Sequence, residues 1–373
     1  MKDMNKSSKG ARKEGETLLM VGTKKGAFLF RSKDGRRTWK ASGPFFKGIQ
    51  VFHMTYDRRT GALLAAVNSY QWGPTVAISH DMGKTWKNCT NPPRFPKESG
   101  LSVQQVWHVE PGLEDRPDEI YLGVEPACLF VSHDSGESWD VDASMMNHST
   151  RSKWSPGNGG LCLHTILSDR RDHDKLHVGI SAVGTLYTEN NGGSWDFQNK
   201  HVLADFFPEA EKYPEYGQCV HKIVRRSDRP NTLFQQNHCG VFRSDDNGRD
   251  WKNITNNLPS RFGFPIAIDS GPSPRVYVAP LEGDFARIPK DGRFSVWASD
   301  NSGKEWFPLN RGIPKVSYYD VLREGLKSDG LDPSGIYFGT TTGQLYSSRN
   351  RGESWSSVSD ALPPIFSVEA SAA

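Results

Sequence analysis

The sequence predicts an all-β protein made of seven repeated units of short strands. Its apolar runs are short and are separated by turn-forming residues, among them 36 glycines and 23 prolines, and seven of its eleven tryptophans recur at regular intervals. Residues 161–195 form one complete unit, with three short apolar runs and a glycine-containing turn that closes on Trp195. The other units are variations on this one.

The closing tryptophans define the repeat, and intervals of 47, 53, 56, 56, 55 and 49 residues separate Trp39, Trp86, Trp139, Trp195, Trp251, Trp306 and Trp355. A polar turn precedes each of them, most clearly at Ser79 to Thr85 and at Ser132 to Ser138. An Asp or Asn side chain in such a turn accepts hydrogen bonds from nearby backbone N–H groups, while glycine adopts a positive φ. The tryptophan is then expected to pack between neighbouring sheets.

This turn resembles the Asp-box, or BNR, repeat of sialidase-like propellers, sortilin-type receptors and photosystem II assembly factors. The resemblance covers roughly residues 17–369 in seven copies and implies a seven-bladed β-propeller. It also implies that the polar turns lie on the face opposite the ligand. Sialidase activity is not predicted, because Arg287-Ile288-Pro289 stands in the sixth unit and the inner strands offer no arginine clamp.

Each unit is predicted to contain four strands, A to D, with A innermost. Six A strands are expected at 51–56, 106–110, 162–167, 219–224, 264–268 and 318–322. The first unit begins with a B strand, and the apolar segment 365–369 has no partner of its own. Because closing the ring removes an unpaired sheet edge, we expect 365–369 to form the innermost strand of the first blade.

Composition and charge exclude several classes of protein. A formal charge of +3, from 46 basic and 43 acidic residues, provides no strong attraction for nucleic acid or an anionic membrane, and no apolar run is long enough to span a bilayer. Residues 1–16 are basic and lack an apolar signal core, so they are expected to be a disordered tail of a cytoplasmic protein. One domain is predicted at 17–369, followed by a tail at 370–373. Five cysteines without paired spacing indicate free thiols.

Histidines provide the main functional indication. Aligning the A strands on their apolar residues places His53, His108, His164 and His221 in one layer around the channel, while Asp320 takes this position in the last unit. Long connections at 88–104, 140–160 and 196–218 converge on the same face. Neutral imidazoles suit a divalent transition metal such as Zn, Mn or Fe. We expect His108, His164 and His221 as ligands, with His53 as a fourth ligand or behind them; alternatively, the four simply line a polar channel.

Three further residues are candidates for proton transfer. Glu125 and His238 stand where B strands end at the same rim, and Asp320 is either a general base or a partner of backbone N–H groups. These residues favour a metal-dependent hydrolase or lyase that acts on a saccharide or another oxygenated small molecule. The alternative is a scaffold without catalytic activity that binds a protein or peptide across the rim, as the photosystem assembly factors imply.

Overall fold

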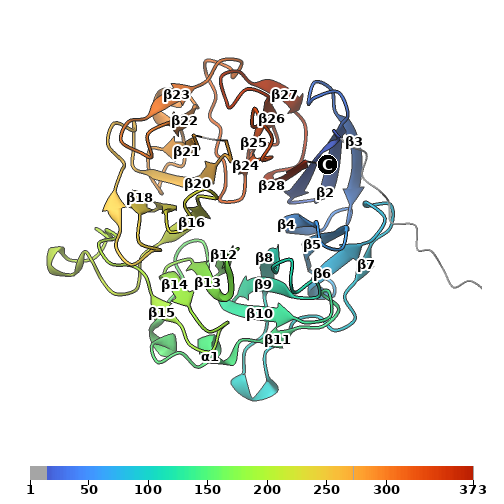
Figure 1. Cartoon of the computed structure of the whole chain (residues 1–373), viewed down its shortest axis with the longest axis vertical. Helices are drawn as coiled ribbons and strands as arrows, with labels where there is room; N and C mark the ends of the chain where they lie inside the picture. The colour runs from blue at the N-terminus through green and yellow to red at the C-terminus, as the bar shows by residue number, and fades with distance from the viewer. Residues whose placement is uncertain (1–14, 272, 373) are drawn as a thin grey trace, which may run out of the picture.

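The computed structural model describes residues 15–271 and 273–372 and shows seven four-stranded antiparallel sheets around a central axis (Figure 1). The predicted seven-bladed β-propeller is confirmed. Blade 1 contains β28 (Ile365–Ala372), β1 (Thr17–Thr23), β2 (Gly26–Ser32) and β3 (Lys40–Phe45). Blade 2 contains β4 (Gln50–Asp57), β5 (Ala62–Ser69), β6 (Gly73–Ser79) and β7 (Lys87–Asn88).

The next three blades follow the same order from the axis outward. Blade 3 contains β8 (Gln105–Pro111), β9 (Ile120–Glu125), β10 (Cys128–Ser132) and β11 (Asp140–Val141). Blade 4 contains β12 (Leu163–Asp169), β13 (Asp172–Ile180), β14 (Gly184–Thr188) and β15 (Asp196–Phe197). Blade 5 contains β16 (Val220–Arg225), β17 (Leu233–Asn237), β18 (Gly240–Ser244) and β19 (Lys252–Asn253).

The last two blades complete the ring. Blade 6 contains β20 (Phe262–Ile268), β21 (Val276–Leu281), β22 (Val296–Ser299) and β23 (Phe307–Leu309). Blade 7 contains β24 (Leu326–Ser328), β25 (Ile336–Gly339), β26 (Leu345–Ser348) and β27 (Ser356–Ser359). Short helices lie in the connections, at η1 (Lys97–Ser99), α1 (Ala143–Met146), η2 (Arg151–Lys153), η3 (Glu209–Glu211) and η4 (Lys290–Gly292).

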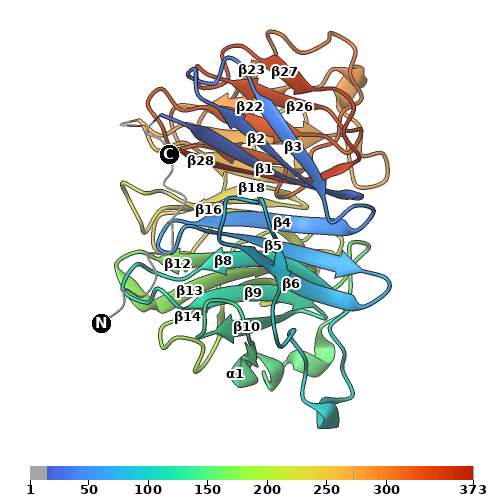
Figure 2. The same cartoon turned by 90° about the vertical axis from the view of Figure 1, so that its right-hand side faces the viewer.

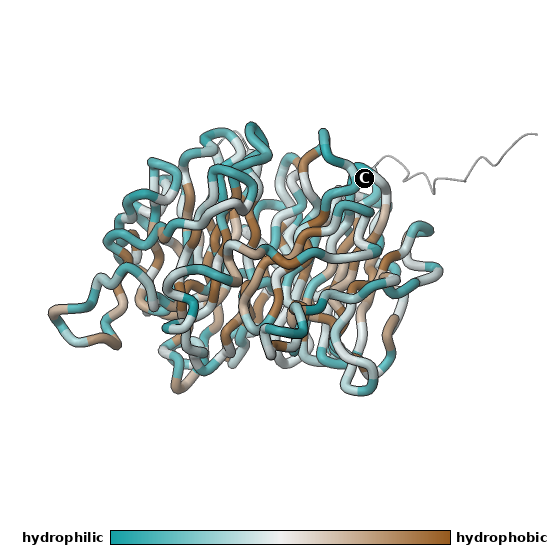
Figure 3. The backbone as a smooth tube through the Cα atoms, turned by 90° about the horizontal axis from the view of Figure 1, so that it is seen from below, coloured by the Kyte–Doolittle hydropathy of each residue, from teal (hydrophilic) through white to brown (hydrophobic). Residues whose placement is uncertain are grey.

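The meander gives the molecule two different faces (Figure 2). Connections from the second to the third strand of a blade, and from the fourth strand to the next blade, lie on one face, which we call the mouth face. The tight turns between the first two and the last two strands lie on the opposite face, which we call the turn face. Apolar backbone segments fill the interior of the blades and hydrophilic ones cover their ends (Figure 3).

Ring closure occurs as predicted, because β28 pairs with β1 and provides the innermost strand of blade 1. Val368 pairs with Val21 in this ladder, and both side chains are fully buried. The strand is longer than predicted and continues through Ala372. The predicted tail at residues 1–16 lies outside the described residues, apart from Gly15 and Glu16.

We expect Val368→Asp to lower the free energy of unfolding by more than about 3 kcal/mol, because a carboxylate would be buried without a partner at the closing strand. Denaturant unfolding followed by circular dichroism measures this change. Ser356→Asp is the control, since Ser356 is exposed in the outermost strand β27. Equal stability of the two variants would contradict closure by β28.

The tryptophans hold each outer strand against the preceding blade. In all seven blades the fourth strand begins at the residue after the predicted tryptophan, from Lys40 in blade 1 to Ser356 in blade 7. Trp306 Nε1 donates to the Ile254 carbonyl at 2.8 Å and Trp355 Nε1 to the Leu309 carbonyl at 3.0 Å. The spacing of the repeated tryptophans in the sequence therefore corresponds to the spacing of the contacts between blades.

The polar turns share one hydrogen-bond pattern. In blade 3, Ser132 Oγ donates to Asp134 Oδ1 at 2.8 Å and accepts from the Gly136 N–H at 2.8 Å, while Asp134 also accepts from the Ser138 N–H and hydroxyl. Two successive residues of the turn have positive φ, 61° at Ser135 and 93° at Gly136. In blade 1 the glycine precedes Arg36 instead of following it, and both have φ of 68°, so one glycine in either place is accommodated.

We expect Ser132→Ala to lower the free energy of unfolding by about 1–2 kcal/mol, because it leaves the buried Gly136 N–H without an acceptor. Ser138→Ala also removes a serine hydroxyl group, but this hydroxyl makes an exposed hydrogen bond to Asp134. It should therefore lower the free energy of unfolding by less. Thermal and denaturant unfolding of the pair measure the difference. An effect of Ser138→Ala that equals or exceeds that of Ser132→Ala would contradict this assignment.

One predicted strand is wrong. The innermost strand of blade 7 is β24 (Leu326–Ser328), whereas residues 318–322 belong to the connection that precedes it. Tyr318 is exposed there, and the preceding Ser317 pairs with Arg293 of blade 6. The true strand escaped recognition because it is short and carries Lys327, whereas the connection contains a run of aromatic and aliphatic residues. All five cysteines have free thiols, and no helix in the described ranges could cross a membrane.

Candidate functional site

A bulge near the mouth face shapes the innermost strands of blades 1 to 5. One residue in each has no partner on the adjacent strand, and these residues are Phe366, Phe52, Trp107, His164 and His221. In blade 6, Phe264 and Pro265 are skipped in the same way. A bulge turns successive side chains away from strict alternation, so the bulged residue and the one after it form two neighbouring layers of the channel.

The four predicted histidines therefore do not share one register. His164 and His221 are bulged residues, whereas His53 and His108 directly follow a bulge and re-enter the ladder opposite Ala66 and Gly123. The predicted alignment of the strands is therefore wrong by one residue between blade 3 and blade 4, and the four histidines do not form a single layer. The apolar neighbours used for the alignment could not reveal which residue of each strand is the extra one.

His164 and His221 each connect their blade to the next one. Nε2 of His164 donates to the Val220 carbonyl at 3.0 Å, and its Nδ1 contacts Thr165 Oγ1 at 3.0 Å. Nδ1 of His221 donates to the Gly263 carbonyl at 2.5 Å. Burial, followed by the charge of Arg323, holds the imidazole pKa of both residues well below its usual value. Burial therefore favours the neutral form of both rings.

His53 and His108 belong instead to a buried ionic cluster inside the channel. Their rings stack with centroids 4.1 Å apart. Nε2 of His53 lies 3.5 Å from Glu369, and Nδ1 of His108 lies 3.5 Å from Glu324. Burial lowers the pKa of His53. Burial also opposes the charged form of His108, but Glu324 and Glu110 raise its pKa above the usual value.

Two lysines complete this ionic cluster. Lys222 Nζ bonds to Glu324, and Lys327 Nζ bonds to Glu369 at 2.7 Å. Burial alone would raise the pKa of Glu369, but Lys327 and His53 hold it at about 2. The two glutamates and two lysines of this cluster, Glu324, Glu369, Lys222 and Lys327, were not predicted as site residues. Glu324 and Lys327 lie beyond the misplaced strand of blade 7, and Glu369 was assigned only a closing role.

Above the ionic cluster, aromatic rings and an arginine surround the mouth. Phe52 lies 4.8 Å from Trp107 and 5.0 Å from Phe366 between ring centroids. The Arg323 guanidinium lies 6.0 Å from the Trp107 ring and 5.5 Å from that of Phe264, and its Nε is buried without a hydrogen-bond partner. No sequence motif predicted Arg323 as a site residue. It lies in an irregular connection, four residues before Lys327.

Glu125 and Asp320 lie at this mouth in different environments. Glu125 accepts a hydrogen bond from Trp107 Nε1 at 3.0 Å, and Gly160 packs against its carboxylate, because a Cβ on Gly160 would come within 2.4 Å of Oε1. Asp320 Oδ1 is buried without a hydrogen-bond partner. Burial, only partly opposed by Arg287, raises the pKa of the Asp320 carboxyl to about 6. Arg287 itself lies 5.3 Å from the Phe264 ring.

His238, the third proton-transfer candidate, lies beside His221 rather than with Asp320 or Glu125. Its ring centroid is 5.9 Å from that of His221 and 5.0 Å from that of Phe262, and its Nε2 is 3.9 Å from Asp284 Oδ2. Burial lowers its pKa. Among described residues, two groups bring three possible metal-binding atoms within 4.8 Å of one another: Cys219 with His221 and His238, and His53 with His108 and Glu324.

Exposed apolar side chains mark the mouth face. Every large apolar side chain that is exposed in the described part of the chain belongs to a connection on this face: Tyr70, Trp72, Leu101, Phe206, Tyr213, Phe285, Val316 and Tyr318. Surface aromatic groups of this kind are typical of binding surfaces. Two surface hollows, lined by 116–119 with His133 and by 256–257 with 304–307, contain none of the predicted site residues.

We expect acid to destabilise the ionic cluster through Glu369. A carboxyl pKa depressed to about 2 contributes stability that is present above its unfolded value and is lost as the pH falls toward 2. Between about pH 5 and pH 2.5, wild type should therefore lose about 2 kcal/mol more of its free energy of unfolding than Glu369→Gln. Denaturant titrations at both pH values measure this. Glu98→Gln, which changes an exposed carboxylate, should follow the wild type.

Comparison with known proteins supports the fold and connects it with two kinds of protein. No family model matches the chain. The oligoxyloglucan-reducing end-specific xyloglucanase of Emericella nidulans is 24% identical over 260 residues, which cover 61% of this chain and 30% of the xyloglucanase. An ancestral GH74 enzyme superposes with a TM-score of 0.60 at 16% identity, covering 84% of this chain and 39% of the enzyme.

The second kind is represented by YCF48 bound to D1 peptide, with a TM-score of 0.53 at 11% identity, covering 91% of this chain and 98% of YCF48. The chain thus spans less than half the length of the xyloglucanase and the GH74 enzyme that it resembles. Identities this low show the propeller fold, which is shared by glycoside hydrolases and by a peptide-binding protein.

Proposed function

We propose that this propeller binds a polysaccharide across its mouth face and hydrolyses a glycosidic bond there. The observation that carries the proposal is the placement of two unlike carboxyl groups, Glu125 and Asp320, on the face that also holds the exposed aromatic side chains. The similarity to a xyloglucanase and to a GH74 enzyme supports the same substrate class.

The exposed side chains would bind the sugar chain. Tyr70 and Trp72 extend from blade 2, Phe206 and Tyr213 from the connection into blade 5, and Phe285 from blade 6. Such rings stack on the apolar faces of pyranose units with little loss of conformational freedom. Their distribution over several blades suits a polymer that crosses the face more than a single small sugar.

The carboxyl groups would perform the acid–base chemistry. Glycoside hydrolysis needs one protonated carboxyl group that donates to the leaving oxygen and one carboxylate that assists attack at the sugar carbon. Asp320, with its pKa raised to about 6 and one oxygen unpartnered, suits the acid role. Glu125, oriented by the Trp107 N–H, suits the second role. A chain of contacts lies between the two carboxyl groups. The Arg323 guanidinium contacts the rings of Trp107 and Phe264, and the Arg287 guanidinium contacts the Phe264 ring.

We expect Asp320→Asn and Glu125→Gln each to reduce hydrolysis of soluble xyloglucan at least about 100-fold, because each removes a proton donor or a carboxylate. Release of reducing ends measures this, and circular dichroism verifies the fold. Glu282→Gln, in the exposed connection of blade 6, is the matched control and should keep its activity. Wild-type activity should decline as the pH rises above about 6, where Asp320 loses its proton.

The scaffold alternative rests on the same exposed side chains, which would also suit an extended peptide. The two functions separate in one experiment, in which calorimetry measures binding of xyloglucan oligosaccharides to wild type and to Trp72→Ala. Saccharide binding that is weakened at least about tenfold by Trp72→Ala supports the proposal. If wild type neither binds nor cleaves xyloglucan or related β-glucans, saccharide hydrolysis is rejected and peptide binding becomes the favoured function. This acid–base chemistry needs no metal.

A further inference from the structure

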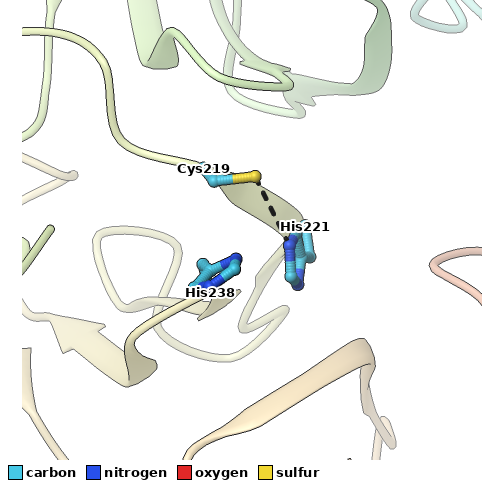
Figure 4. Close-up of side chains that lie close together, drawn as sticks. All are labelled: Cys219, His221 and His238. Atoms are coloured by element: carbon cyan, nitrogen blue, oxygen red, sulfur yellow. Dashed lines mark hydrogen bonds between the residues drawn. The ribbon is translucent and has the colours of Figure 1, made fainter. Parts of the chain in front are cut away.

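Backbone pairing brings a cysteine and two histidines together at the mouth end of blade 5. Cys219 directly precedes β16, His221 is the bulged residue of that strand, and His238 directly follows β17. The His238 N–H donates to the Cys219 carbonyl at 2.9 Å, which fixes the two residues opposite each other. The three side chains point toward a common centre (Figure 4), with donor atoms within 4.8 Å of one another.

The hydrogen bonds of His221 prepare one nitrogen for binding. A carbonyl only accepts hydrogen bonds, so the 2.5 Å contact with Gly263 places the ring proton on Nδ1. Nε2 therefore carries the lone pair, which accepts only the weak hydrogen bond of the Cys219 thiol, with Sγ at 3.5 Å. Metal-binding histidines characteristically donate their other N–H to a carbonyl or carboxylate in this way. The ring is buried and held between blades 5 and 6, so its orientation is already set.

The surroundings of the group suit a cation with an open coordination position. Cys219 is half-buried and His238 is about a quarter exposed, at 26%, so the group meets solvent on one side. Asp284 Oδ2 lies 3.9 Å from His238 Nε2 and provides a nearby negative charge. A thiolate and two neutral imidazoles are ligands for zinc or cobalt, and three protein ligands leave a fourth position free.

The neighbouring blade shows the same backbone arrangement without the second imidazole. Cys162 and His164 occupy the positions of Cys219 and His221, and the Ser181 N–H donates to the Cys162 carbonyl at 2.9 Å, as His238 does in blade 5. Serine thus replaces His238, and both nitrogens of His164 are already in contact with protein oxygens. Blade 4 therefore offers a matched control within the same chain.

The other group, His53 with His108 and Glu324, is poorly suited to a cation. Glu324 is already bonded to Lys222, and Lys327 is bonded to the neighbouring Glu369. Two ammonium groups at this place repel a divalent ion and satisfy the carboxylates instead. Of the four histidines expected as ligands from the sequence, only His221 has a lone-pair nitrogen beside a thiol and a second imidazole.

We propose that Cys219, His221 and His238 form a mononuclear site for a divalent transition metal of the zinc class, with its fourth position open toward the mouth face. The site goes beyond saccharide hydrolysis by Glu125 and Asp320 and does not depend on it. Of the metals expected from the sequence, zinc fits a Cys-His-His set better than manganese, which prefers oxygen ligands.

Cobalt titration of the full chain tests the site. Protein freed of metal with a chelator and kept reduced is titrated with Co²⁺, and thiolate-to-cobalt charge-transfer absorption is recorded, followed by displacement with Zn²⁺. We expect one equivalent to bind. Cys219→Ser should abolish the charge-transfer band, and His238→Asn should weaken Co²⁺ binding at least about tenfold. Cys162→Ser, the matched change in blade 4, should leave both the band and the affinity unchanged.

Cys239→Ser is a second control, because the Cys239 thiol bonds to Asp205 at 3.1 Å rather than joining the group. Thermal unfolding verifies that each variant is folded. A charge-transfer band that persists in Cys219→Ser, or is lost in Cys162→Ser, would overturn the assignment, as would a wild type that binds no Co²⁺ at stoichiometric concentration. Hydrolysis of xyloglucan measured in excess chelator tests the proposed function independently of the metal.

Discussion

The pairing of β28 with β1 closes the seven blades into a ring. Six blades can form from consecutive strands, but the seventh sheet needs strands from both parts of the chain. Without that pairing, the inner edge of β1 would have backbone N–H and C=O groups without hydrogen-bond partners. The ring of blades would also remain open. The buried pair Val21 and Val368 therefore belongs to the ladder that closes the channel.

The bulges give this closed ring its chemistry. In a regular strand, every second side chain would point into the channel. One extra residue near the mouth directs two successive side chains toward the channel instead. Trp107 and His108 show the result: the first borders the mouth beside Arg323, and the second lies in the ionic cluster beneath. Aromatic and charged layers are stacked in this way without any long insertion in the inner strands.

Much of the architecture could be predicted from the sequence, because tryptophan spacing and turn residues report local structure that recurs in every blade. The closing strand was also predictable, since 365–369 was the apolar segment left without a blade. The histidine register was not, because a bulge leaves no mark in the pattern of apolar residues. His164 and Trp107 occupy equivalent places although their flanking residues align His164 with His108. The partners Glu324 and Lys327 were hidden by the misplaced strand of blade 7.

Closure by β28 also makes the mouth a composite of segments that lie far apart in the sequence. Phe366 completes the aromatic layer against Phe52, and Glu369 pairs with Lys327 in the ionic layer, and both residues belong to β28, which follows the strands of blade 7 in the sequence. The strand that closes the ring is therefore also the strand that completes both layers of the mouth.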